Sequence, residues 1–502
     1  MGIVWSATRN GDAAKLENVL MEFPDLIDTL DIYNKTPMHI AAEYGHVSVI
    51  ETLVRLGSTA IDTLEESGCT PMFMAASNGH VSVIETLVRL GSTTIDTPDK
   101  YGKTPMYLAA RRGRVSVIET LVRLGSTAID TPDIDGITPM YIAARHGHVS
   151  VIETLVRLGS TAIDTFAQFE WTPMFVAACY GHVSVIETLV RLGSTAIDVP
   201  DITGWTPMYA AAENGHRSVI ETLVRLESTA IDTPNRNGET PMYAAAENGH
   251  SSVIETLVRL ESTAINTPNR NGYTPIYAAA CNKHTLVIET LVRLGSTAID
   301  TPDENGYTPM YVAAEYGNVL VIKTLVRLGS TAIDTPNNHG WTPMYVAASN
   351  GHALVIETLV QLGSTSMDTL KNDDDRTPMY VAAQNGHVSV IETLVRLKST
   401  AIDICSNNGM TPIYAALRNG HTSVIETLVR LGSANIDIRG NDDDLFMTDI
   451  AYRLQRKSII TLHHLGVLHD SSSFVYNEDE NTKMRHRVYF QQSLVSRCLF
   501  HL

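Results

Sequence analysis

A short motif that recurs at a fixed interval limits this chain to one kind of architecture. The dipeptide Thr-Pro begins at Thr36 and returns every 34 residues up to Thr342, and again at Thr377 and Thr411. The segment VIETLVRL occurs ten times, first at Val49. Such a period is typical of arrays in which each unit packs against its neighbours. The 502 residues therefore form a repeat array rather than three or four separate globular domains.

The sequence of each unit predicts two helices and a projecting loop, as residues 104–136 illustrate. Thr104 is a suitable N-cap and Pro105 a suitable first helical residue, because the N–H that proline lacks has no partner in a first turn. Gly113 can end this helix in the left-handed conformation. A second helix follows from about Ser116 with an apolar face, and again ends at a glycine. The loop STAIDTPDIDG then has the Pro and Asp-x-Asp-Gly chemistry of turns.

One unit cannot bury two apolar helices alone, so the units must stack into a solenoid. The shared pattern G-x-TPMYVAA-x-x-GH-x-x-VI-x-x-L-x-x-LG closely resembles the ankyrin repeat, although Met and mostly Tyr stand where that family usually has Leu and His. His39 keeps the family residue. The resemblance implies an all-α ankyrin-repeat solenoid of stacked helix-turn-helix units with short β-hairpin-like finger loops.

The resemblance also divides the chain. Residues 1–35 resemble an N-terminal capping ankyrin unit, residues 36–445 hold twelve repeats of mostly 34 residues, and residues 446–466 resemble a degenerate C-terminal repeat. Residues 467–502 form a polar tail, whose last part is compatible with a short helix.

Composition excludes several classes of function. Lys and Arg number 37 against 55 Asp and Glu, for a formal net charge of −18, and so acidic a surface repels nucleic-acid backbones. Charges interrupt every long apolar stretch, so none reaches the roughly 20 residues that a membrane span needs. Five scattered cysteines without CxxC spacing argue against zinc sites and disulfides, and fit a reducing compartment. We expect a soluble, intracellular, cytoplasmic monomer with no nucleic-acid partner; the composition leaves the nucleus open as the alternative location.

Catalytic and cofactor motifs are missing from the sequence. No Walker loop, dinucleotide fingerprint, Gly-x-Ser-x-Gly or kinase signature occurs. Gly-His pairs recur in most repeats, but helices stacked about 10 Å apart hold these rings too far apart to share a metal ion. We therefore predict a protein that is not an enzyme and has no cofactor or metal, in which the histidines are structural. The first residues, MGIVWS, weakly match the pattern for myristoylation of Gly2.

Differences among the repeats indicate a binding surface. The apolar helix positions barely change, whereas the residue before Thr-Pro and the two residues after Ala-Ala vary. In the ankyrin family these positions face the concave groove and the finger tips, where partners bind. Three of the four tryptophans share the column before Thr-Pro, and exposed Trp and Tyr are favoured interface anchors. Alternatively, these rings pack on the adjacent finger and only stiffen the array.

Two groups of residues thus become candidates for partner binding. The aromatic candidates are Trp171, Trp205, Trp341, Tyr180, Tyr273 and Tyr307. We expect Trp171 and Trp205, backed by Tyr180, to be the central anchor. The basic candidates in repeats three and four are Arg111, Arg112, Arg145 and His146. Glu213, Glu247 and Glu315 make the later groove acidic to neutral. Such a groove would suit an extended peptide or a polar protein surface, although single charges on a solvated face mean little.

These features predict a non-catalytic scaffold or adaptor that binds a partner protein along the concave ankyrin groove. The fold alone does not name a partner, so the prediction rests on the resemblance and on the aromatic column. The alternative is a substrate-receptor subunit of a ubiquitin ligase that recruits the ligase through the C-terminal tail. Only the apolar segment 493–502 supports it.

Three repeats depart from the Leu-Gly that ends most second helices, with Glu227, Glu261 and Lys398 in place of Gly. If this position is left-handed, a residue with a Cβ costs roughly 1 kcal/mol relative to Gly. A negative charge at a helix C-terminus is also unfavourable. We therefore predict that the adjacent repeats six and seven form the weakest internal segment, unless the loop there adopts another turn.

Overall fold

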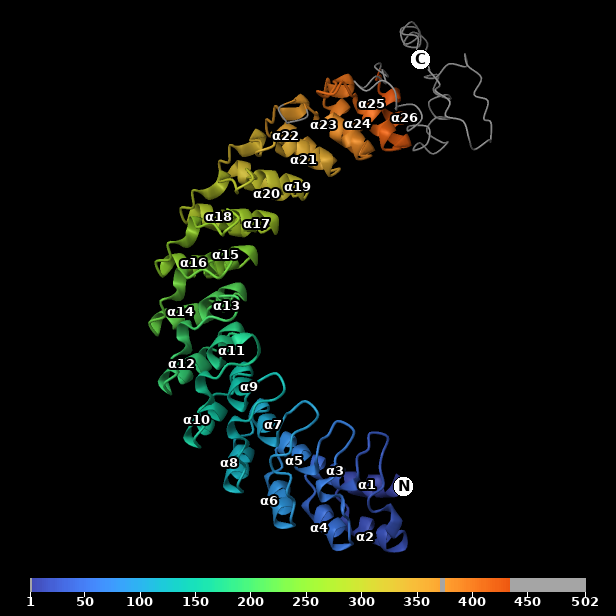
Figure 1. Ribbon diagram of the computed structural model, residues 1–502, viewed down its shortest axis with the longest axis vertical. Coiled ribbons are helices and arrows are strands. Elements are labelled where there is room, and N and C mark those ends of the chain that lie inside the picture. The colour runs from blue at the N-terminus through green and yellow to red at the C-terminus, as the bar shows by residue number, and fades with distance from the viewer. Residues whose placement is uncertain (1, 371–374, 434–502) are drawn as a thin grey trace, which may run out of the picture. The chain divides into compact units, whose positions relative to one another are not determined.

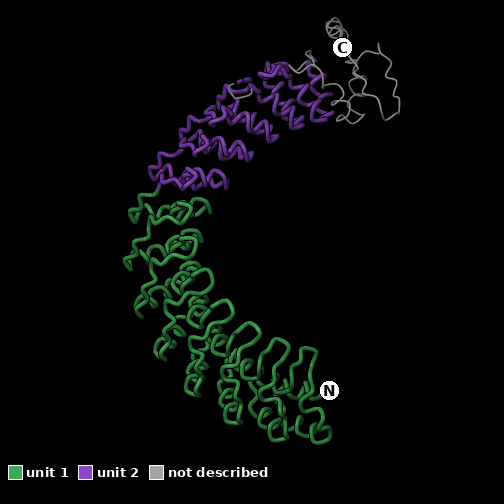
Figure 2. The backbone as a smooth tube through the Cα atoms, viewed as in Figure 1, with its two compact units in different colours: residues 1–264 green, residues 265–502 purple. Residues whose placement is uncertain are grey.

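The computed structural model describes residues 2–370 and 375–433 (Figure 1). This part of the chain consists of α-helices and short 3₁₀-helices, without any strand. Packing divides the chain into two compact units, residues 1–264 and residues 265–502 (Figure 2). The predicted degenerate repeat 446–466 and the tail 467–502 lie outside the described residues.

Unit 1 has two layers of helices. The first helix of each repeat belongs to the inner layer, which lies on the concave side of the unit in Figure 1. The inner layer contains α1 (Gly2–Arg9), α3 (Pro37–Tyr44), α5 (Pro71–Asn78), α7 (Pro105–Arg111), α9 (Pro139–Arg145), α11 (Pro173–Cys179), α13 (Pro207–Glu213) and α15 (Pro241–Glu247). The outer layer contains α2 (Ala13–Glu22), α4 (Val47–Arg55), α6 (Val81–Arg89), α8 (Val115–Arg123), α10 (Val149–Arg157), α12 (Val183–Arg191), α14 (Arg217–Arg225) and α16 (Ser251–Arg259). Each helix contacts its partner in the same repeat and the next helix of its own layer.

Unit 2 repeats this plan. Its inner helices are α17 (Pro275–Cys281), α19 (Pro309–Glu315), α21 (Pro343–Ser349), α23 (Pro378–Gln384) and α25 (Pro412–Arg418). Its outer helices are α18 (Thr285–Arg293), α20 (Val319–Arg327), α22 (Ala353–Gln361), α24 (Val388–Arg396) and α26 (Thr422–Arg430). The 3₁₀-helices of the described residues in both units are η1 (Pro24–Leu26), η2 (Ala60–Asp62), η3 (Ala128–Asp130), η4 (Ala162–Asp164), η5 (Gln168–Glu170), η6 (Ala196–Asp198), η7 (Ala230–Asp232), η8 (Ala264–Asn266), η9 (Ala298–Asp300), η10 (Ala332–Asp334), η11 (Ser366–Asp368) and η12 (Ala401–Asp403).

Local sequence sets the helix ends as predicted. The backbone N–H of Tyr107 donates to Thr104 Oγ1 at 3.1 Å, so the threonine caps α7. Gly113 and Gly125 are left-handed, with φ of +71° and +97°. The second helix begins at Val115, one residue before the predicted start. The finger loops are tight hairpin-like turns, in which the N–H of Asp99 donates to the Lys103 carbonyl at 2.9 Å.

Polar groups tie each repeat to the previous one. The Nε2–H of His148 donates to the Arg111 carbonyl, 3.0 Å away, so the Gly-His histidines join repeats as structural groups. Asp62 accepts hydrogen bonds from the Ser92 hydroxyl at 2.6 Å and from the backbone N–H of Thr93 at 3.0 Å. Burial alone would raise the pKa of Asp62, but these bonds outweigh it and lower that pKa. The hydrogen bonds to ionised Asp62 therefore stabilise the fold at pH values above the ordinary carboxyl pKa. This contribution is lost as acid protonates Asp62.

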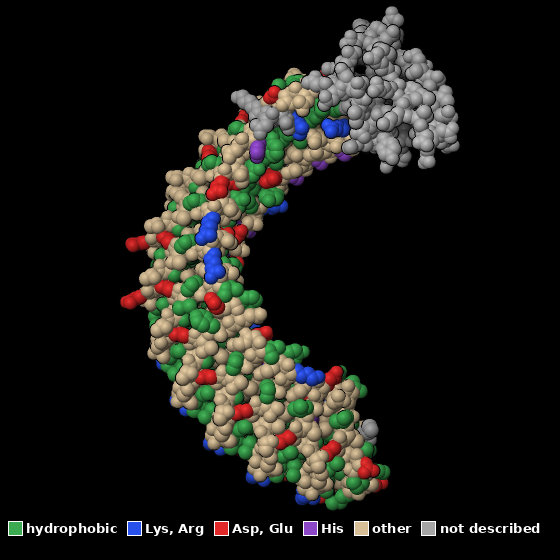
Figure 3. Space-filling view, in the orientation of Figure 1, with side chains coloured by type: hydrophobic (Ala, Val, Ile, Leu, Met, Phe, Trp, Pro, Cys, Tyr) green, Lys and Arg blue, Asp and Glu red, His purple; other side chains and the backbone are tan. Residues whose placement is uncertain are grey.

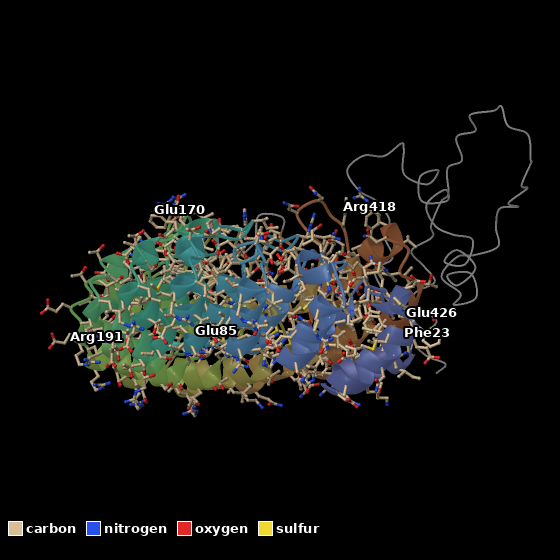
Figure 4. All side chains as sticks on the ribbon, turned by 90° about the horizontal axis from the view of Figure 1, so that it is seen from below. Phe23, Glu85, Glu170, Arg191, Arg418 and Glu426 are labelled. Atoms are coloured by element: carbon tan, nitrogen blue, oxygen red, sulfur yellow. The ribbon has the colours of Figure 1, made fainter. Side chains whose placement is uncertain are left out.

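The outer helices carry a ladder of ion pairs, most of which join a Glu to an Arg 38 residues later, whereas Glu357 and Arg396 are 39 residues apart. Arg123 lies 2.5 Å from Glu85 across α6 and α8, and the two side chains are 58% and 46% exposed. Figure 3 shows basic side chains at regular intervals along the outer edge of unit 1. Figure 4 labels Arg191, a member of this ladder, and Glu170, which belongs to a finger loop. The two side chains lie well apart, so the ladder and the finger loops are on different parts of the unit. Pairs this exposed each contribute little to stability.

Three helix ends confirm the left-handed conformation predicted at non-glycine residues. The φ angles of Glu227, Glu261 and Lys398 are +68°, +67° and +68°. A Cβ built at the equivalent Gly125 would meet no atom within 4 Å. The cost at these positions is therefore one of backbone conformation and charge, not of crowding.

Replacing Glu227 and Glu261 by Gly is expected to stabilise the chain by about 1 kcal/mol per site, because glycine adopts the left-handed conformation without a Cβ penalty. Hydrogen exchange of residues 206–264 should slow, and the urea midpoint should rise. Gly125→Glu, the reverse change at the equivalent position of repeat three, should accelerate exchange in its own repeat. Unchanged exchange in the double variant would refute this account of the two sites.

Candidate partner-binding face

The inner helices of unit 1 present three side chains per repeat along one line. In repeat six these are Trp205 before the N-cap, Tyr209 in the first turn and Glu213 at the end of α13. Residues four apart on a helix share a face, so the varied positions of the sequence lie together on the inner layer. We call this surface of repeats three to seven the inner face.

The aromatic column is half-buried rather than exposed as predicted. The Trp171 ring lies 5.0 Å from the Phe175 ring, and its Nε1–H donates to Asp201 Oδ2 of the next finger at 3.1 Å. The Trp205 ring lies 4.9 Å from the Tyr209 ring. Each ring packs on the aromatic residue four positions later, which covers part of it. Trp171 therefore packs against the next finger, as the alternative to partner binding expected. Part of each of the two rings nevertheless stays accessible.

The other candidates of this column lie in unit 2 and pack in the same way. Trp341 lies 5.5 Å from Tyr345, measured between ring centroids. Tyr273 stacks on Tyr277 at 4.4 Å, and Tyr307 stacks on Tyr311 at 4.7 Å. These three residues therefore belong to a different compact unit from Trp171 and Trp205.

Tyr180 does not back the two tryptophans, because α11 separates it from Trp171. Nine residues of largely helical chain place the two roughly 13 Å apart. Tyr180 is 45% exposed, and its ring stacks on His182 with 6.5 Å between centroids. The Arg145 guanidinium lies 5.2 Å from the centre of the Tyr180 ring, which is a cation–π distance. Tyr180 therefore belongs with the basic candidates.

The basic candidates gather at the C-terminal ends of α7 and α9. Arg111, Arg112 and His146 are exposed and Arg145 is half-buried. Within the described part of the chain, none of the three arginines forms an ion pair. Burial and the nearby Arg111, followed by His148 and Arg145, lower the pKa of His146. The section therefore holds uncompensated positive charge.

The acidic section lies on α13, α15 and the finger between them. Burial, followed by the nearby Glu247, Glu239 and Asp201, raises the pKa of Glu213 to about 7. Glu213 Oε2 is buried and has no hydrogen-bond partner among the described residues. Burial and Glu239 also raise the pKa of Glu247. Glu213, Glu247, Glu239 and Asp201 thus bring four carboxyl groups close enough to influence one another's ionisation.

Glu239 is, with Asp201, one of the two carboxylates of this section that the sequence does not single out. Its Oε2 accepts hydrogen bonds from the Asn235 side chain at 2.7 Å and from the Tyr209 hydroxyl at 3.3 Å. The signal was available, because Glu239 occupies the same column as Trp171 and Trp205. In unit 2, burial raises the pKa of Glu315 in the same way.

Residues 2–370 and 375–433 contain no group of three or more His, Cys, Asp and Glu side chains placed to hold a metal ion. No helix in that part is long and apolar enough to cross a membrane. Gly2 is exposed at the start of α1, and its myristoylation stays a prediction.

Comparison with known proteins decides the family. A model of three consecutive ankyrin repeats matches residues 4–99, 90–165, 158–233, 225–302, 294–369 and 365–442. The chain belongs to the ankyrin repeat family. Ankyrin repeats are protein–protein interaction modules, and proteins built from them are generally non-catalytic. No curated protein matches this ankyrin chain. Among solved structures, this chain is similar to the crystal structure of the human ASB11 ankyrin repeat domain, with 23% sequence identity and a TM-score of 0.41. The match covers 45% of this chain and 98% of that domain.

Proposed function

We propose that this ankyrin repeat protein is a non-catalytic scaffold or adaptor whose inner face binds an extended segment of a partner protein. Glu213 carries the proposal. Its carboxylate is half-buried, has no hydrogen-bond partner at Oε2 among the residues that the structure describes, and has a pKa raised to about 7. An ionised group kept out of water without a counter-charge destabilises a fold. A cation supplied by a partner would remove that cost.

The other end of the inner face supports a partner with charge of both signs. Arg111, Arg112 and Arg145 place three positive charges there, and none of them forms an ion pair within the described residues. The basic and acidic sections are about three repeats, or roughly 30 Å, apart if each repeat adds about 10 Å. An extended chain covers that distance in about nine residues. The proposed partner segment therefore carries an acidic end and a basic end, with apolar residues between them against Trp171 and Trp205.

Removal of the two tryptophans tests the proposal. Trp171→Ala and Trp205→Ala should each weaken partner binding by about 2 kcal/mol, because half-buried aromatic rings at the centre of an interface are typical hot spots. Affinity capture with the full chain identifies partners, and titration then measures their affinities. Arg191→Ala, at an exposed ladder position, is the control and should leave capture unchanged. A double Trp variant that keeps the wild-type circular dichroism and captures every partner would show that the inner face is not the binding site.

The ubiquitin-ligase alternative depends on the tail 467–502, outside the described residues. Copurification of ligase components that is lost on deletion of this tail would favour it. The cytoplasmic location and the monomeric state stay predictions.

A further inference from the structure

Three outer helices of unit 2 each expose a leucine at their second residue. Leu286 on α18, Leu320 on α20 and Leu354 on α22 are 62%, 65% and 63% exposed. All nine other repeats carry serine at this position. We call these three side chains the leucine ridge.

The fold does not need these leucines. Serine occupies the same place in helices of equal length elsewhere in the chain, and their buried faces carry the same Val, Ile, Thr and Leu residues. The three leucines follow one another on adjacent outer helices that contact each other, α18 with α20 and α20 with α22. Exposed apolar side chains that line up in this way are a feature of interaction surfaces.

The ion-pair ladder changes at the same place. Lys323 stands where the other outer helices of repeats one to twelve carry Glu, and Gln361 stands where they carry Arg. The two positions are 38 residues apart and are ladder partners, so the changes together avoid a Lys–Arg repulsion. The exposed Lys323, three residues after Leu320, consequently has no ion pair within the described residues. The neighbouring pair of Glu289 and Arg327 is kept.

We propose that the leucine ridge binds an amphipathic α-helix of a partner protein that has an apolar seam and acidic flanks. Residues seven apart on a helix share a face and lie about 10.5 Å apart along its axis. This spacing matches the roughly 10 Å between stacked outer helices, so a partner helix that lies across them places one apolar residue near each leucine. A carboxylate beside its central apolar residue would then pair with Lys323.

Charge favours an acidic partner helix over two other possible occupants of the leucine ridge, the C-terminal segment of the chain itself and a second copy of the chain. Residues 485–502 of the chain are apolar in part, but they carry Arg485, Arg487 and Arg497 and no acidic residue. A second copy of the ridge presents the same Lys323. Both would bring positive charge toward Lys323, whereas an acidic partner helix neutralises it.

A designed peptide tests the ridge on the full chain. The probe is a 21-residue helix with leucines at the a and d positions of three heptads and glutamates at e and g. It should bind wild type at least tenfold more tightly than the variant with Leu286→Ser, Leu320→Ser and Leu354→Ser, which restores the residue of the other repeats. Lys323→Glu should weaken the probe and strengthen a counterpart with lysines at e and g.

A ridge transplanted into unit 1 is the matched control. Ser82→Leu, Ser116→Leu and Ser150→Leu, made in the triple-serine variant, create three exposed leucines beside an intact Glu–Arg ladder, and should not restore probe binding. Equal binding of the probe to wild type and the triple-serine variant overturns the proposal, as does equal binding of the glutamate and lysine peptides. Crosslinks from Lys323 to Lys457 or Lys483 in the isolated chain, lost in the triple-serine variant, would assign the ridge to the tail. A dimer in sedimentation that the serine changes abolish would assign it to a second copy.

Discussion

Asn318→His is expected to destabilise the repeats around it by about 3 kcal/mol, and Lys283→Gly in the same chain is expected to remove most of that loss. The prediction follows from the turn between inner and outer helices. Most repeats have glycine there, and the His ring of the next repeat packs directly over it. A Cβ built at Gly317 would lie 2.9 Å from Nδ1 of His352, closer than real Cβ atoms approach.

Repeat eight breaks this rule, and repeat nine accommodates the change. Lys283 takes the glycine position in the left-handed conformation, with φ of +67°. Asn318 takes the histidine position of the following repeat, is 7% exposed, and donates from Nδ2 to the Ala280 carbonyl at 3.5 Å. The shorter asparagine leaves room for the Lys283 Cβ, whereas an imidazole would collide with it.

Hydrogen exchange of residues 275–327 is the appropriate measurement, because long repeat arrays need not unfold in one step. Asn318→His should accelerate exchange there, and the double variant should return close to wild type. The matched pair in the same unit is Gly351 with His387, where the Cβ approach is 2.8 Å. Gly351→Lys alone should destabilise that turn, and His387→Asn should rescue it. Independent, additive effects in both pairs would contradict the packing argument.

The sequence predicts most of the local structure, because each boundary depends on residues close in the chain. Thr104 and Pro105 begin α7, and Gly113 ends it, through hydrogen bonding and backbone preferences that act within a few residues. The left-handed conformation of Glu227 and Glu261 follows from comparison with the glycines of sibling repeats. The array and the ankyrin family follow from the period itself.

Contacts between repeats were harder to predict, since they require the relative placement of stacked helices. The ladder pair of Glu85 with Arg123 has a separation of one repeat plus one helical turn, a spacing that is meaningful only once consecutive outer helices are known to lie in register. Half-burial of Trp171 and Trp205 has a local part, because each ring lies on the aromatic residue four positions later. For Trp171 it also has a part that depends on stacking, the hydrogen bond to Asp201 of the next finger. The charge columns predicted the acidic section, but the unpaired oxygen of Glu213 depends on which neighbours surround it.

Glu213→Gln is expected to stabilise the free protein while it weakens partner binding. The pKa of Glu213 is about 7 in the folded chain, above the ordinary 4.5. A raised carboxyl pKa means that ionisation opposes folding, so stability falls as pH rises from about 4.5 through 7. Glutamine removes this loss. After allowance for solvent screening of a half-buried group, the gain at pH 8 should be about 1 kcal/mol, and it should vanish at pH 4, where the carboxyl group is protonated in both states.

Partner binding should respond with the opposite sign. If a partner cation meets Glu213, glutamine leaves that cation without a counter-charge, and the affinity at pH 8 should fall by about 2 kcal/mol or more. Thermal unfolding at pH 4 and pH 8 and titration of a captured partner measure the two effects in one variant. Glu187→Gln, on an exposed outer helix, should change neither beyond a few tenths of a kcal/mol. Affinity that is unchanged in Glu213→Gln would contradict the assignment of the acidic section to partner binding. Opposite signs from one substitution would mean that this carboxylate serves recognition at the expense of the fold, since a group that opposes folding has no structural reason to be there.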